Sequence, residues 1–546
     1  MRTVPYALLP FVLSTVVTLV SIPAASADDY FLTIGGGYSP EGNQISLEKN
    51  VLFYQRLLSE RLSESIPHDI YFADGESPRR DLQYSDPDAV PKANRLMGRT
   101  LMNEGHLDYM YRSHEVPGVH GASTYKNIET WFHEIGSKLQ SGDRLIVYAT
   151  AHGGKSDNKE QPYNSQLFTF ESEPVKMKDL AGKLAALPEG VNVVLIMVQC
   201  YAGGFSHVIF NQGEAAKGTS ARNVCGFFAT THDRPAAGCT PDIREEEYQE
   251  YSSFFWAALG SKTRLGESIP TPDYDEDGEV SLEEAHAYVL LTSDAVDIPT
   301  RTSGAYLRHY SKTEDNGWPD LIDSETPYEE MLKLASPVER AVLEGLSRQL
   351  NLEGNNRVEA TREVIKQIEK RRGELAAEGK TAADRANELK GAIAKSIRNR
   401  WPELTNLLHG KATELLTANS AEFIKTVESH KDYQEFSGLL DKIEDIKKQN
   451  FDLDRKWAKC QRFFRTAEDV ALAANLSKVA APEIQQRYKQ LLAAERGTLQ
   501  GARQPVEPTE TEPTEPEQTE PEPTETAQAD ADRSEAAQAE TAPAKE

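Results

Sequence analysis

Two continuous apolar runs, residues 145–149 and 193–198, constrain the fold of this chain more than any other feature. Neither run alternates apolar with polar residues, so each predicts a strand that is buried on both faces of a sheet. Further strand candidates lie at residues 30–34, 68–73 and 225–230, and amphipathic stretches separate them. The sequence therefore predicts an α/β fold with a mostly parallel sheet flanked by helices.

The first 27 residues have the pattern of a secretory signal peptide. Arg2 precedes an apolar run over residues 6–22, and the small residues 25–27 give the pattern that signal peptidase cleaves. A membrane anchor is the alternative, but Pro10 interrupts the apolar run. No later stretch approaches the roughly 18–20 apolar residues that a spanning helix needs. We expect a secreted or periplasmic protein with no membrane span after cleavage.

The chain changes character twice after the α/β part, for which we expect residues 28–325. Residues 326–500 are charged and carry apolar positions at helical spacing, so they predict an all-α region whose helices pack as a bundle or bind a partner. Residues 501–546 consist mainly of Glu, Pro, Thr, Gln and Ala, which predicts a disordered acidic tail. The formal net charge of −26 argues against a nucleic-acid partner, because phosphates repel such a surface.

Each of the two long apolar runs leads into a reactive residue. The first continues to His152 and Gly153, and the second to Cys200, which a glycine-containing turn follows. The carboxyl ends of neighbouring parallel strands lie at one edge of a sheet, where an imidazole can take the proton of a thiol. Glycine lets the backbone approach a substrate, and free N–H groups there can stabilise an oxyanion. A buried cysteine and a hydrogen-bonded loop histidine are the alternatives.

These residues resemble a known family. A strand ending in His-Gly, followed by a strand ending in Cys and a turn of small residues, is similar to the caspase-like cysteine peptidases of clan CD. Residues 228–235, Phe-Ala-Thr-Thr-His-Asp-Arg-Pro, resemble most closely the legumain family. The resemblance covers about residues 30–310 and implies a caspase-like fold and a secreted cysteine endopeptidase acting through a thioester. It implies Cys200 as nucleophile, His152 as acid and base, and the N–H groups of Gly153 and Cys200 as oxyanion hole.

The chain departs from this family around the substrate pocket. Caspases and legumain carry Gln or Glu two residues before the cysteine, where this chain has Val198. Gln199 directly precedes Cys200 and points to the opposite face of the strand. Asp233 and Glu250 are the candidate pocket acids that would favour a basic residue before the cleaved bond. Surface acids without that role are the alternative for both.

Residues 273–284 match an EF-hand calcium loop. Asp273, Asp275 and Asp277 occupy positions 1, 3 and 5, Glu279 supplies a carbonyl at position 7, and Glu284 stands at position 12. Prolines before the loop prevent a regular incoming helix, so we expect an EF-hand-like loop that binds Ca²⁺ in a structural role.

Two other classes of function stay open. One is an inactive caspase-fold scaffold that binds a peptide or a partner, and the other is an acyl transferase or transpeptidase on the same dyad. The helical region, 326–500, is a candidate cap over the active site, because legumain has a helical segment in that place. Cys225 and Cys239 are close enough in sequence to form a disulfide, and Cys460 is expected to be a buried thiol.

Overall fold

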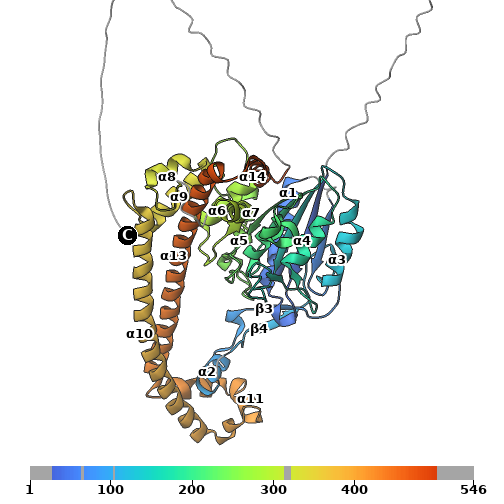
Figure 1. Ribbon diagram of the computed structural model, residues 1–546. Coiled ribbons are helices and arrows are strands. Elements are labelled where there is room, and N and C mark those ends of the chain that lie inside the picture. The colour runs from blue at the N-terminus through green and yellow to red at the C-terminus, as the bar shows by residue number, and fades with distance from the viewer. Residues whose placement is uncertain (1–27, 63–66, 103–104, 313–320, 501–546) are drawn as a thin grey trace, which may run out of the picture. The chain divides into compact units, whose positions relative to one another are not determined.

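The structure is a computed structural model that describes residues 28–62, 67–102, 105–312 and 321–500. The expected signal peptide and acidic tail lie outside these residues. A seven-stranded sheet in the order β12-β11-β10-β6-β1-β2-β5 forms the centre (Figure 1). Neighbouring strands pair in parallel except at β12, which pairs antiparallel with β11. The strands are β1 (Asp29–Gly36), β2 (His68–Phe72), β5 (Val119–Gly121), β6 (Arg144–Ala151), β10 (Asn192–Met197), β11 (Asn223–Phe228) and β12 (Thr300–Arg301).

Helices cover both faces of the sheet, as the unbroken apolar runs predicted. Every residue of β6 is buried, because one apolar core lies on each side of it. On one face lie α1 (Ile45–Arg61), α5 (Tyr251–Gly260), α6 (Leu282–Thr292), α7 (Thr302–Tyr310) and α14 (Pro482–Glu495). On the other face lie α3 (Tyr125–Glu134), α4 (Met177–Ala185) and a 3-10 helix at Ala202–Ile209. The predicted fold class is confirmed.

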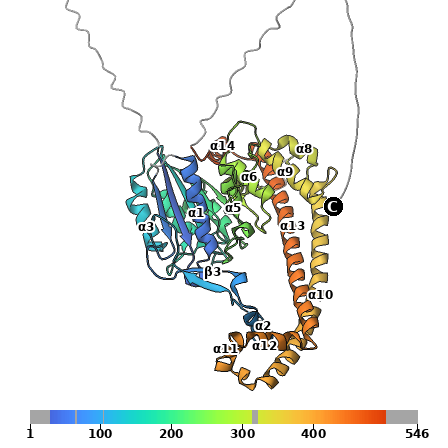
Figure 2. The ribbon, with the colours of Figure 1, turned by 180° about the vertical axis from the view of Figure 1, so that it is seen from behind.

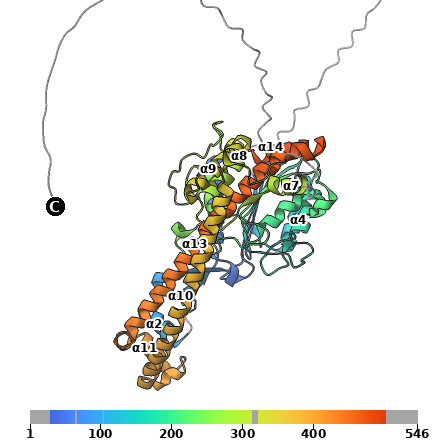
Figure 3. The same cartoon turned by 60° about the vertical axis from the view of Figure 1, so that its left-hand side comes forward.

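The helical region is built around two long helices that lie side by side, α10 (Arg357–Arg400) and α13 (Tyr433–Val479) (Figure 3). Shorter helices complete it: α8 (Tyr328–Leu334), α9 (Pro337–Leu350), α11 (Gly410–Leu416) and α12 (Ser420–Glu428). The helices α8 and α9 share an apolar core with α6 and α13. Among the described residues, no helix has the length and apolar character needed to cross a membrane.

Two helices connect the α/β part with the helical region, which the sequence suggested as separate domains. Helix α2 (Lys92–Leu101) lies between β3 (Leu82–Ser85) and β4 (Tyr109–Arg112) in the chain. It packs with α10, α11 and α12 in a distal core (Figure 2). Helix α14 packs back against β11, so the helical region both begins and ends beside the sheet.

The last described residues complete this contact. The Arg144 guanidinium, on β6, donates hydrogen bonds to the backbone carbonyls of Thr498 and Leu499, each at 2.7 Å. It also pairs with the Asp29 carboxylate at 2.6 Å. The buried guanidinium therefore joins the first strand, a central strand and the end of the described chain.

Candidate active site

The pairing of β6 with β10 places the backbones of His152 and Cys200 at one edge of the sheet. Ala149 lies opposite Met197, and the backbone N–H of Val198 donates to the Ala149 carbonyl at 3.0 Å. His152 and Cys200 each lie three residues beyond this pair. Both residues follow the last residues of their strands, Ala151 of β6 and Met197 of β10. The structure thus places the backbones of the two predicted residues at the same edge of the sheet, where a Cβ atom on Gly153 would collide with the Cys200 carbonyl oxygen.

Hydrogen bonds from the preceding loop fix the tautomer of His152. Its Nε2 atom lies 2.8 Å from the Gly42 carbonyl oxygen and 2.8 Å from Oε1 of Gln44. A carbonyl oxygen only accepts, so Nε2 carries the proton and Nδ1 keeps its lone pair. Burial lowers the pKa of His152, against the opposing effect of the Gly42 hydrogen bond. His152 is therefore a neutral imidazole with a free basic nitrogen.

Tyr38 borders this imidazole. The Tyr38 and His152 rings meet edge to face with their centroids 5.2 Å apart, and Tyr38 remains 47% exposed. The Tyr38 backbone carbonyl accepts a hydrogen bond from the Glu171 N–H at 2.9 Å, which fixes the loop that carries the ring. Tyr38 thus presents an open aromatic surface beside the candidate base.

The Cys200 thiol lies against the loop that follows β11. The Ala236 N–H donates to Sγ at 3.2 Å, and the thiol donates to the Ala236 carbonyl over 3.6 Å. Burial raises the pKa of the Cys200 thiol, the Ala236 N–H lowers it, and the nearby Asp297 carboxylate raises it. The thiol is therefore protonated at neutral pH and needs a base to become a nucleophile.

Gly153 provides the close backbone approach that the sequence suggested. A Cβ atom at this position would collide with the Cys200 carbonyl oxygen. Gly153 lies in β7 (Gly153–Gly154), opposite Leu167 of β8 (Gln166–Leu167), and the adjacent Phe168 N–H donates to His152. In an antiparallel ladder this makes Gly153 a residue whose own N–H points away from β8. That N–H therefore makes no hydrogen bond within the β7–β8 ladder.

One residue with a strained backbone directly follows the cysteine. Tyr201 has φ of 61°, a left-handed conformation that is uncommon outside glycine and asparagine. Its N–H donates to the Arg234 carbonyl at 2.9 Å, which ties the turn after Cys200 to the loop after β11. Such strain persists only where surrounding contacts hold it, and it clusters at functional sites.

The helical region contacts this loop through α13. The Arg234 guanidinium stacks over the Trp457 ring, 4.5 Å from its centroid. Arg462, one of the largest fully buried side chains, donates to four backbone carbonyls. These carbonyls belong to Leu290, Ser293, Ala295 and Asp297.

Asp297 carries this contact to the cysteine loop. It is 1% exposed, and its carboxylate accepts a hydrogen bond from the Ala237 N–H at 2.7 Å. Burial raises the pKa of Asp297 to about 7. Ala237 follows the residue that contacts the Cys200 thiol. A chain of contacts therefore runs from α13 through Asp297 to the candidate nucleophile.

The two candidate pocket acids occupy different surroundings. Glu250 is fully buried and pairs with Arg264 at 3.1 Å, so its carboxylate already has a cation inside the protein. Asp233 is exposed and accepts a hydrogen bond from the Thr231 hydroxyl at 2.5 Å. Asp233 is the one that solvent and ligands reach, whereas Glu250 forms part of an internal ion pair.

The EF-hand-like loop gathers its acidic side chains. Carboxylate oxygens of Asp273, Asp275 and Asp277 lie within 4.8 Å of one another. The Glu284 carboxylate accepts from the Tyr274 N–H at 2.7 Å, which brings position 12 back to the start of the loop. The exposed Glu279 side chain is directed to solvent, in agreement with a ligand role for its carbonyl only. Oxygen donors in this arrangement fit a calcium ion.

Several residues of this site have no signal in the sequence. The partner of His152 is the Gly42 carbonyl, and the partners of Cys200 are backbone atoms of Ala236. Any residue type supplies such atoms. All four cysteines are free thiols, so the suggested bridge between Cys225 and Cys239 does not form, and Cys460 is buried as expected.

Comparisons with known proteins do not assign the chain to a family. No family model and no curated protein matches the chain. Among solved structures, the crystal structure of a protein from Geobacter sulfurreducens is similar over 50% of this chain and 92% of its own, with 10% identity and a TM-score of 0.28. A likeness that weak carries no argument about what this chain does.

Proposed function

We propose that the protein is an exported cysteine endopeptidase that uses Cys200 and His152. The observation that supports this most directly is the equal offset of both residues from the paired Ala149 and Met197. A buried structural cysteine has no need of a neutral imidazole at the same edge of the sheet, with its proton fixed on the far nitrogen by Gly42.

The geometry supports a simple sequence of steps. His152 Nδ1 takes the thiol proton as Sγ of Cys200 attacks the peptide carbonyl carbon, and the carbonyl electron pair moves to oxygen. The N–H groups of Gly153 and Cys200 are the donors proposed for that oxyanion. Collapse of the intermediate breaks the C–N bond, and the imidazolium returns its proton to the leaving amine. Water, deprotonated by His152, then hydrolyses the thioester and regenerates the thiol.

A diverse peptide library incubated with the full chain tests this proposal. We expect cleavage at defined bonds, and a peptidyl acyloxymethyl ketone built on the preferred sequence should alkylate Cys200, as peptide mapping by mass spectrometry will show. Ligated peptides in place of hydrolysed ones would assign the acyl transferase instead. Binding of library peptides without cleavage or alkylation would assign the inactive scaffold.

The pH dependence of kcat/KM follows from the two pKa shifts. His152 must be neutral to act as a base, and burial lowers its pKa below the ordinary 6.5. Activity is therefore expected to fall only as the pH drops through a midpoint below 6.5. Burial raises the thiol pKa above 9.0, so the free enzyme should show no thiolate absorbance at neutral pH. A preformed thiolate at pH 7 would contradict this assignment.

We also propose that the loop over residues 273–284 binds Ca²⁺ and stabilises the fold. Asp273, Asp275, Asp277 and Glu284 would hold the ion with their carboxylates, and Glu279 with its carbonyl. The N–H of Leu282, at position 10 of the loop, donates to the Gly497 carbonyl at 2.9 Å, so an ordered loop supports the return of α14.

Removal of Ca²⁺ is accordingly expected to lower stability. At a free concentration 100 times Kd, binding adds about 2.7 kcal/mol to the free energy of unfolding. Asp275→Asn should abolish the rise in Tm that Ca²⁺ causes, because a charged ligand is lost. Glu276→Gln is the matched control, since position 4 of the loop supplies no ligand. Equal Tm values for the native chain in Ca²⁺ and in chelator would refute the site.

A further inference from the structure

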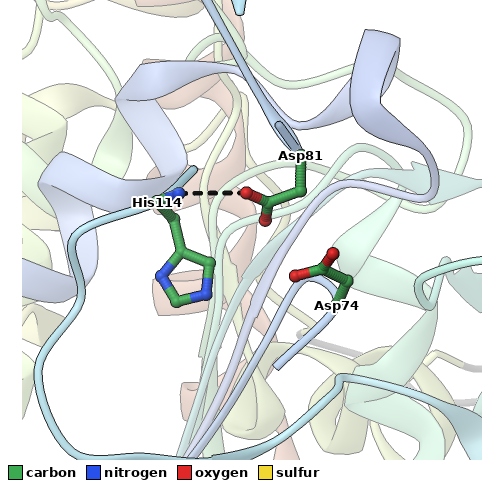
Figure 4. A group of neighbouring side chains, drawn as sticks. All are labelled: Asp74, Asp81 and His114. Carbon is green, nitrogen blue, oxygen red and sulfur yellow. Dashed lines mark hydrogen bonds between the residues drawn. The ribbon is translucent and has the colours of Figure 1, made fainter. Parts of the chain in front are cut away.

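A second cluster of ligating side chains lies away from both sites described above. Asp74 follows β2, Asp81 precedes β3 and His114 follows β4. One ligand atom from each lies within 4.8 Å of the other two. Figure 4 shows the Asp74 carboxylate and the His114 ring facing each other, with the Asp81 carboxylate beside them. The loop between β2 and β3, which carries both aspartates, and the loop after β4 thus converge on one point.

Asp81 is the innermost member of the cluster. It is 0% exposed and accepts from the His114 N–H at 2.9 Å and from the Asn43 side-chain amide at 3.3 Å. Within the described part of the chain, no ion pair with the Asp81 carboxylate is found.

Asp74 supplies an independent observation, a buried oxygen without a partner. Its side chain is 1% exposed, and Oδ2 pairs with Nε of Arg79 at 3.1 Å. Oδ1 is also buried and has no hydrogen-bond partner among the residues that the structure describes. Leaving a buried carboxylate oxygen unpaired is costly, so native proteins place a ligand there or avoid the arrangement.

His114 is arranged to join such a ligand. Its Nε2 atom faces Asp74 (Figure 4) and lies 2.8 Å from the Gly75 carbonyl oxygen. Its Nδ1 atom accepts a long hydrogen bond, 3.3 Å, from the Val116 N–H. Metal binding at Nε2 moves the ring proton to Nδ1 and replaces both of these hydrogen bonds. The Gly75 carbonyl oxygen, released from its bond to Nε2, is the candidate for a fourth ligand.

The geometry points to a divalent transition-metal site of the Zn²⁺ class, formed by the carboxylates of Asp74 and Asp81 and by His114 Nε2. An imidazole with carboxylates suits Zn²⁺, whereas Ca²⁺ prefers oxygen donors alone. The cation offsets two buried negative charges. Arg79, which is itself half exposed, pairs with one oxygen of Asp74. This inference concerns metal binding and does not require the proposed peptidase activity.

The site lies one contact away from the loop that holds the His152 imidazole. The Asn43 amide donates to the Asp81 carbonyl at 3.0 Å, and its Oδ1 accepts from the Gly37 N–H at 3.0 Å. Gly42, the neighbour of Asn43, provides the carbonyl that fixes His152. A bound metal therefore stiffens this loop. An effect of this stiffening on catalysis rests on the proposed function, whereas metal binding at the site does not.

Zinc titration of the full-length Cys200→Ala protein tests the site. The substitution removes the thiol beside His152, a competing ligand, and saturating Ca²⁺ occupies the EF-hand-like loop. Equilibrium dialysis against ZnCl₂ followed by elemental analysis should give one bound equivalent. Asp74→Asn and His114→Gln, which keep size and hydrogen-bonding capacity, should each lose that equivalent. Glu171→Gln, which changes an exposed partner of Arg79 on the outer side, should retain it.

The outcomes separate clearly. No bound equivalent in the parent protein overturns the proposal, and so does an equivalent that survives both substitutions. Circular dichroism on each variant shows whether it is folded, and an unfolded His114→Gln protein leaves Asp74→Asn to decide. Loss of zinc in the Asp275→Asn variant would instead assign the ion to the calcium loop.

Discussion

Cys200→Ala is expected to abolish peptide cleavage while leaving the fold intact. Among the described residues, the thiol hydrogen-bonds to two backbone atoms of Ala236 and to no side chain, so its removal costs little stability. Loss of the nucleophile removes the covalent pathway entirely, and kcat/KM should fall by on the order of 10⁴-fold or more. The measurement is kcat/KM on the peptide that the library selects, together with Tm for both proteins.

Cys239→Ala is the matched control, because it deletes another thiol of the same region. We expect it to retain kcat/KM within a few-fold of the parent value. Equal activity of the parent and Cys200→Ala proteins would refute the assignment of the nucleophile. His152→Ala, with an expected loss of about 10²–10⁴-fold, separates a catalytic base from a bystander.

Arg462→Met is expected to destabilise the protein by about 3 kcal/mol or more, because each buried carbonyl that loses its partner costs about 1–3 kcal/mol. Its guanidinium donates to four buried carbonyls between Leu290 and Asp297, and methionine satisfies none of them. The same change should lower kcat/KM, because Asp297 holds the Ala237 N–H beside the Cys200 loop. Urea unfolding and steady-state kinetics measure the two effects.

Arg385→Met provides the comparison for that prediction. Arg385 lies on α10, where its ion pairs with Glu388 and Glu435 are solvent-exposed. Exposed pairs of this kind contribute about 0–1 kcal/mol, so its substitution should leave both stability and activity nearly unchanged. Similar unfolding midpoints for the two variants would contradict the structural role assigned to Arg462.

Local sequence predicted the parts of the structure that local physics determines. The continuous apolar runs specified β6 and β10 because only a strand with helices on both faces buries such a run. The acidic loop was recognisable because its candidate ligands lie within twelve consecutive positions. The common edge of His152 and Cys200 also followed, once parallel strands were assumed.

Pairings between distant segments account for what the sequence did not reveal. The sequence of β6 does not specify β10 as its neighbouring strand. The group that fixes His152 is the backbone carbonyl of Gly42, and every residue type has a backbone carbonyl. Asp74 and Asp81 lie on one loop and His114 on another, so no local spacing motif marks the three residues together. Glu250 was a reasonable pocket acid until Arg264, which follows α5 in the chain, proved to be its partner.

The hydrogen bonds between Arg144 and the carbonyls of Thr498 and Leu499 have a consequence for biosynthesis. They join residues up to 355 positions apart. Helix α14, which lies just before Thr498 and Leu499 in the chain, covers one face of the sheet. At about 5–20 residues per second, a ribosome needs roughly 20–70 s to deliver the second partner after the first. During that interval β6 and β11 lack part of their apolar cover. A nascent chain of this design is therefore expected to depend on chaperones until translation ends, and premature termination before α14 should yield aggregation-prone fragments.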